Sequence, residues 1–190
     1  FQVLESNSRF ASLLPKANST MRRALPDGKN NHSVAAWISI GGIDVILGAD
    51  LENTADSRGG WAAIVESTNR PSGEVSLFKV PHHGSENGHN VELWEMVLAD
   101  DVIAVVTPWN RSSGLPGVGD LERLSSATKN LFLTAKPSSL TRARHDHSVE
   151  RMMREFGIST SRHAKNVGAV TARRPVSDEG EWSVESWDME

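Results

Sequence analysis

The chain of 190 residues contains no cysteine and no tyrosine, and aromatic residues make up only 6% of it. Without cysteine there can be no disulfide bond and no thiolate ligand for a metal ion. The longest apolar runs, such as residues 102–106, are too short to cross a bilayer. The first residues lack the basic flank and the apolar core of a signal peptide. We therefore expect a cytoplasmic protein without a membrane span.

Basic residues are not in excess. The chain has 20 Lys and Arg residues and 24 Asp and Glu residues, which gives a net charge of −4. This balance argues against a protein coated with positive charge for bulk nucleic-acid binding. A hydrophobic content of 38% and a charged content of 23% are typical of a folded globular protein. The length and the change in composition predict an irregular segment over residues 1–27 and one domain over residues 28–190.

The hydrophobic pattern predicts strands and helices in alternation. Alternating or continuously apolar segments predict strands over residues 33–40, 43–48, 75–80, 101–107 and 130–134. Helical spacing predicts helices over residues 57–67, 90–98, 118–127 and 148–156. Gly41-Gly42 is typical of a tight hairpin turn, and residues 168–173 and 182–185 are expected to form a closing hairpin. This order combines antiparallel hairpins with βα units and predicts an α/β protein with a layered sheet.

A carboxylate and a histidine pair follow two neighbouring predicted strands. Asp50 comes just after residues 43–48, and His82 and His83 come just after residues 75–80. Strand ends are where α/β folds place their chemistry, since the strand holds the side chain firmly and leaves it accessible. Carboxylate and imidazole groups are ligands for zinc and related divalent metals. The pattern is compatible with convergence on one metal ion, and also with an ordinary turn and an ordinary loop.

Together with Asn30-Asn31-His32-Ser33, the segments Leu47–Glu52 and Lys79–Ser85 resemble the metallo-β-lactamase fold superfamily. The most similar members are the hydrolase domains of the ComEC/Rec2-like DNA-uptake proteins. These have an Asn-Asn-x-Ser strand start, a Gly-Asp after the next strand and a His-His-Gly-Ser loop. Later features also fit, namely Thr107-Pro108, Leu115-Pro116 and Gly168-Ala169-Val170. The resemblance covers roughly residues 28–187.

This resemblance implies an αββα sandwich of two similar halves, of which the chain matches the C-terminal half, a mixed sheet flanked by helices. It also implies a site with two divalent metal ions, zinc in most members and manganese as an alternative. Asp50 matches the carboxylate that bridges the ions, and a loop histidine matches the last ligand. The Pro-Gly-His-Gly form of that loop favours His83 as the ligand. His82 would then face the substrate as a catalytic residue, although both histidines stay in the ligand set.

The main metal motif of the superfamily, His-x-His-x-Asp-His, is absent from this sequence, and so is the single histidine ligand that follows it. Both belong upstream of Asp50, where only His32 is available. His145 and His147 lie downstream, in a segment rich in arginine. The resemblance thus implies a partner, an N-terminal half of the same fold on a separate chain or a cleaved piece.

The expected function is a metal-dependent hydrolase, a phosphodiesterase or nuclease acting on DNA or RNA. Ser85, Arg142 and Arg144 are the expected substrate contacts. One alternative is a small ester, lactone or phosphorylcholine substrate, because fold alone does not fix function. Another is a latent, non-catalytic half released by proteolytic cleavage. An oligomer is compatible with each of these.

Overall fold

The computed structural model describes residues 30, 33–55, 59–111, 114–141, 167–176 and 180–189. Several expectations fall outside these residues. They are the irregular segment 1–27, the helix over residues 148–156, the substrate contacts Arg142 and Arg144, and His32, His145 and His147.

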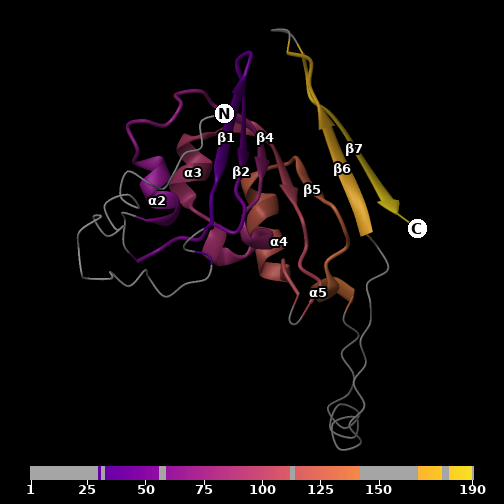
Figure 1. Ribbon diagram of the computed structural model, residues 1–190. Helices are drawn as coiled ribbons and strands as arrows, with labels where there is room; N and C mark the ends of the chain where they lie inside the picture. Colours follow the sequence, from indigo (N-terminus) through magenta and orange to yellow (C-terminus); the bar gives the residue numbers. More distant parts are fainter. Residues whose placement is uncertain are drawn as a thin grey trace, which may run out of the picture.

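A mixed sheet of five strands forms the centre of the molecule (Figure 1). In spatial order its strands are β1 (Ala36–Ile40), β2 (Ile43–Leu47), β3 (Val75–Lys79), β4 (Leu98–Val106) and β5 (Leu131–Leu133). β1 and β2 pair antiparallel across the Gly41-Gly42 turn, where both residues have positive φ angles, as the tight hairpin turn requires. The other pairs are parallel. The predicted α/β class is confirmed.

The parallel strands are joined by helices that pack on one face of the sheet. These helices are α2 (Gly60–Val65), α3 (Val91–Met96) and α4 (Val118–Ala127). The hydrophobic core lies between them and the sheet, where Trp61 and Trp94 meet the ring of Phe78 edge to face at 5.9 and 5.5 Å. Such edge-to-face pairs stabilise a core beyond the area that they bury.

Two predicted boundaries need correction. Leu98, predicted as the end of a helix, begins β4, because it pairs with Val75 and is almost fully buried there. Sheet pairing therefore overrides the helical spacing of residues 90–98. α2 begins only at Gly60, which has a φ of 59° and lies so close to the Glu52 carbonyl that a Cβ atom would collide with it. α4 has its predicted bounds, and the short helix α5 (Ser138–Thr141) was not predicted.

The second face of the sheet is also apolar. It carries Ile38, Val45, Leu77, Val105 and Phe132, which are all partly exposed. Two further side chains of this face, Ile40 and Leu47, are 56% and 41% exposed. Parallel sheets are normally buried on both faces. This second face is therefore an unusually open apolar surface within the described part of the chain.

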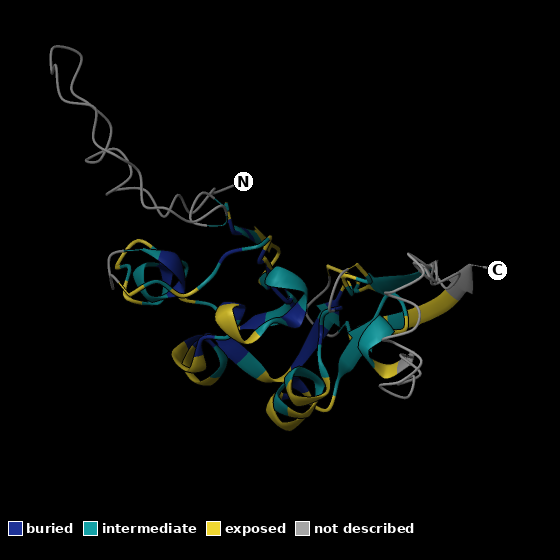
Figure 2. Ribbon diagram, turned by 90° about the horizontal axis from the view of Figure 1, so that it is seen from below, coloured by how far each residue is buried: buried dark blue, intermediate teal, exposed yellow. Residues whose placement is uncertain are grey.

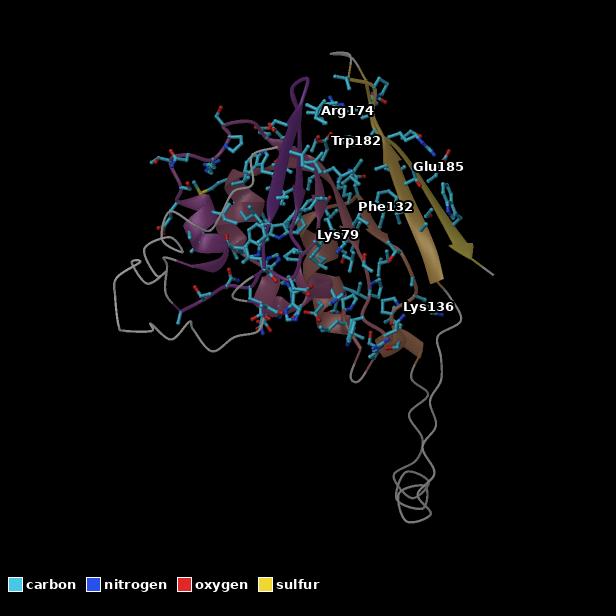
Figure 3. The ribbon with its side chains drawn as sticks, in the orientation of Figure 1. Lys79, Phe132, Lys136, Arg174, Trp182 and Glu185 are labelled. Carbon is cyan, nitrogen blue, oxygen red and sulfur yellow. The ribbon has the colours of Figure 1, made fainter. Side chains whose placement is uncertain are left out.

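A separate two-stranded sheet lies on this side, away from α2 and α3 (Figures 1 and 2). It consists of β6 (Val167–Arg173) and β7 (Ser183–Met189), paired antiparallel as the predicted hairpin. Between it and β1–β2 lies a cavity of about 370 Å³, lined by Ile38, Val45, Ala172 and Trp182 among others. Figure 3 shows Phe132 and Trp182 in the space between the two sheets. The hairpin therefore covers the second face incompletely.

No helix in the described ranges is long and apolar enough to span a membrane.

Candidate metal centre

Two loops meet at the carboxyl edge of the central sheet. β2 and β3 are adjacent and parallel, with Leu47 opposite Lys79, so the residues that follow them come to the same edge. The Gly48 amide donates to the Lys79 carbonyl at 3.0 Å, and the His82 amide donates to the Ala49 carbonyl at 3.0 Å. These hydrogen bonds bring Asp50 next to the histidine pair. The closest approach is 3.7 Å, between Asp50 Oδ1 and His83 Nε2.

The backbone of both loops is left-handed beside this contact. Ala49, His82 and His83 have φ angles of 47°, 44° and 54°, and they are the only non-glycine residues with positive φ in the described ranges. Each such residue costs on the order of 1 kcal/mol or more and persists only where the surrounding structure enforces it. All three lie within one residue of Asp50 or in the histidine pair itself. Strain concentrated in this way is typical of functional loops.

The ring of His83 is oriented by a backbone carbonyl. Its Nδ1 atom lies 2.7 Å from the Thr107 carbonyl oxygen at the end of β4. A carbonyl only accepts, so Nδ1 must donate, and in the neutral ring Nε2 then keeps its lone pair. That lone pair is on the side of Asp50. Metal-binding histidines are commonly fixed by a hydrogen bond of this kind.

The separation of Asp50 and His83 suits two ligands of one ion. Ligands about 2.0–2.1 Å from zinc in tetrahedral geometry lie roughly 3.3 Å apart, close to the observed 3.7 Å. The Asp50 side chain is 47% exposed and the His83 side chain 25% exposed, so an ion can reach both. However, the described residues contain no group of three or more His, Asp or Glu side chains that could hold a metal. Asp50 and His83 could supply two ligands of an ion, and a complete coordination sphere would require others.

His82 has different partners. Its Nδ1 atom lies 2.9 Å from Glu52 Oε1, the distance of an ion pair, although the geometry does not make a hydrogen bond. Asn30 Nδ2 donates to the same Glu52 oxygen at 2.7 Å and lies 3.4 Å from His82 Nε2. The Nε2 atom of His82 is therefore in contact with the Asn30 amide, and the buried Nδ1 atom faces Glu52 without a hydrogen bond. This arrangement favours His83 over His82 as the ligand.

Two further residues that the sequence analysis placed in the loop, Lys79 and Ser85, lie near the centre. Burial lowers the pKa of Lys79, and the negative charge of Asp50 opposes that shift. The Lys79 ammonium group donates to the Val80 carbonyl at 3.0 Å. The Ser85 amide donates to the His82 carbonyl at 2.9 Å, and the Ser85 carbonyl accepts from Gly88 at 3.0 Å. These backbone bonds shape the loop, while the substrate contact of the Ser85 hydroxyl stays a prediction.

An arginine on α4 holds the histidine loop in place. Arg123 Nη2 donates to the Gly84 carbonyl at 2.8 Å and pairs with Asp120 Oδ1 at 2.9 Å. Asp120 Oδ2 accepts from the Gly117 amide at 2.8 Å and so caps α4. The charge of Arg123 also contributes, after burial, to a lowered pKa of His89, which Glu86 partly offsets. The loop is thus fastened to the start of a helix.

Sequence reasoning missed Glu52, the Thr107 carbonyl and Arg123 as parts of the site. Glu52 had a local signal, since it stands two residues after Asp50 in the same segment. Arg123 had none, because its contact with Gly84 spans 39 positions and depends on how α4 packs.

Comparisons with protein-family models, with curated proteins and with solved structures give no match for this chain. The fold and the site define an α/β protein with an incomplete carboxylate and imidazole centre at the edge of its sheet. A more specific assignment of function depends on the two loop motifs, around Asp50 and around His82-His83, and on the geometry of the Asp50–His83 contact.

Proposed function

We propose that this protein is a metal-dependent hydrolase, a phosphodiesterase or nuclease of the metallo-β-lactamase type, whose site is completed by a second half of the fold. One observation carries the proposal. Asp50 and His83 come from two parallel strand ends, stand 3.7 Å apart, and the Nδ1 atom of His83 is engaged by the Thr107 carbonyl. An oriented imidazole beside an exposed carboxylate can supply two of the ligands of a divalent metal ion.

Bound divalent ions, zinc or manganese, would supply a hydroxide nucleophile near neutral pH and would stabilise charge on an attacked phosphate. Asp50 would help to hold the ions. His83 would offer Nε2 to one of them while the Thr107 carbonyl keeps its ring in place. His82, next to Glu52, would face the substrate.

The open second face of the sheet supports the proposal of a partner, which would pack on this face as another sheet layer. This face carries apolar residues on all five strands, and the hairpin covers them only in part. The described ligands are too few for one metal ion. A polypeptide that carries His-x-His-x-Asp-His and packs on this face would cover the apolar residues and would also supply the missing metal ligands.

The test is metal-dependent hydrolysis by the assembled protein. Labelled single-stranded DNA, double-stranded DNA and RNA are compared with a simple ester, a lactone and a phosphorylcholine ester. We expect cleavage of nucleic acid that a chelator abolishes and that zinc or manganese restores. Hydrolysis of the small substrates alone would transfer the proposal to the alternative substrate class. Cleavage that persists in chelator would refute the metal site.

His83→Ala should reduce metal affinity more than His82→Ala does. The first substitution removes a ligand, and we expect a loss above about 100-fold, whereas loss of a supporting group typically costs 10- to 100-fold. Metal content after dialysis against graded chelator measures both variants. The reverse order would assign the ligand role to His82, and equal losses would assign ligand roles to both rings.

Arg123→Ala should weaken metal binding by about 10-fold, because the Gly84 carbonyl loses the donor that holds the histidine loop. Arg123→Lys should recover part of the loss, since an ammonium group can donate one hydrogen bond. Arg70→Ala is a matched control, because Arg70 also donates to a carbonyl, that of Val65, but far from the site. Equal metal affinity in Arg123→Ala and Arg70→Ala would exclude this positioning role.

A further inference from the structure

An exposed indole ring lies beside the candidate metal ligand. Trp109 follows the end of β4, and its ring centroid lies 5.4 Å from that of His83 at an angle of 36°. It is 42% exposed, whereas Trp37 and Trp61 are buried in the core. The Trp109 amide donates to the Leu115 carbonyl at 2.8 Å and the Leu115 amide donates back at 2.9 Å. The backbone that carries the ring is therefore fixed on both sides.

A cation accompanies this ring. The guanidinium carbon of Arg111 lies 5.3 Å from the centroid of Trp109, within the range of a cation–π contact. Arg111 is exposed. His83 and Arg111 thus both lie beside the Trp109 ring, which is 42% exposed, so the candidate metal ligand, an exposed indole and a positive charge are neighbours.

We propose that Trp109 and Arg111 form a stacking platform for an unpaired nucleobase, with Arg111 also available to the phosphate next to it. The inference depends on the proposed function and specifies its substrate class as single-stranded nucleic acid. Aromatic rings combined with basic groups bind single strands in this way, because every base offers a flat face. Inside a duplex those faces are already stacked on one another, so an internal base cannot reach the platform unless its base pair opens.

A purely structural role for Trp109 makes a different prediction. If the indole only packed against His83, its loss would lower metal affinity and would affect all substrates alike. If it stacks on a base, its loss lowers affinity for single strands even where no metal is present. Binding in chelator therefore separates the two roles.

The experiment uses the full 190-residue chain in excess EDTA, titrated with a single-stranded octanucleotide and with a duplex of the same length. We expect the single strand to bind about tenfold more tightly than the duplex. Trp109→Ala should weaken single-strand binding roughly 5- to 150-fold, the equivalent of about 1–3 kcal/mol for one stacked base. Trp109→Phe should retain most of the affinity, and Arg111→Ala should weaken binding and reduce its dependence on salt.

The hairpin offers matched controls. Trp187 on β7 is 44% exposed, and Arg173 on β6 is an exposed arginine paired with Glu185 at 2.9 Å. Trp187→Ala and Arg173→Ala should bind the single strand like the parent chain. Equal affinity of Trp109→Ala and the parent chain would overturn the inference, as would equal losses in Trp109→Ala and Trp187→Ala. Strand binding that needs Trp109, without any metal-dependent cleavage, would retain the platform and refute only the hydrolase.

Discussion

Asp50→Ala is expected to abolish hydrolysis by the assembled protein and to remove its metal. In the proposed site Asp50 would hold the metal ions, and bound metal contributes several kcal/mol of charge stabilisation. At about 1.36 kcal/mol per tenfold change in rate, the loss amounts to at least about 1,000-fold. The fold should persist, because the Asp50 side chain is 47% exposed and stands outside the hydrophobic core. Metal content, turnover and the thermal unfolding midpoint of the variant measure the three expectations.

A matched control separates this effect from a general loss of negative charge. Asp100→Ala removes an exposed carboxylate near the start of β4, at the opposite edge of the sheet. It should leave both metal content and turnover unchanged. Full activity of Asp50→Ala would refute the metal centre, and an unfolded Asp50→Ala would show that this residue is structural.

The convergence of Asp50 and the histidine pair could be predicted because it depends on local patterns alone. Two apolar segments separated by a helical segment predict parallel strands, and parallel strands end at one edge. The α4 helix was predicted with its observed bounds for a similar reason, since Gly117 precedes it and Asp120 caps it locally. The patterns that predict these features each lie within one short segment, although the two loops that meet are far apart in the sequence.

The supporting contacts could not be predicted because each joins distant parts of the chain. Arg123 reaches Gly84 over 39 positions, and His83 reaches the Thr107 carbonyl over 24 positions. Leu98 shows the same limit in the fold, since its pairing with Val75 overrides a local helical pattern. The left-handed backbone at Ala49 is a further case, because alanine rarely adopts that conformation.

The full 190-residue chain alone, dialysed against zinc, should bind metal weakly and hydrolyse no nucleic acid. A complete zinc site needs about three or more protein ligands per ion, and the described residues bring together only Asp50 and His83. Adding a polypeptide with the His-x-His-x-Asp-His motif should restore tight metal binding and cleavage. Metal stoichiometry and cleavage of labelled strands, with and without that polypeptide, provide the measurement.

A substitution on the open face of the sheet tests the proposed association with a second half of the fold. Ile40 is 56% exposed on that face, and burying such a side chain contributes about 1.5–3 kcal/mol. Ile40→Asp should therefore weaken association with the second half by at least about tenfold. Met96→Asp is the matched control, because Met96 is an exposed apolar residue at the end of α3, on the helical side.

If the chain alone held two tightly bound ions and cut nucleic acid, no second half would be needed, and His145, His147 and His163 would be the next candidates for the missing ligands.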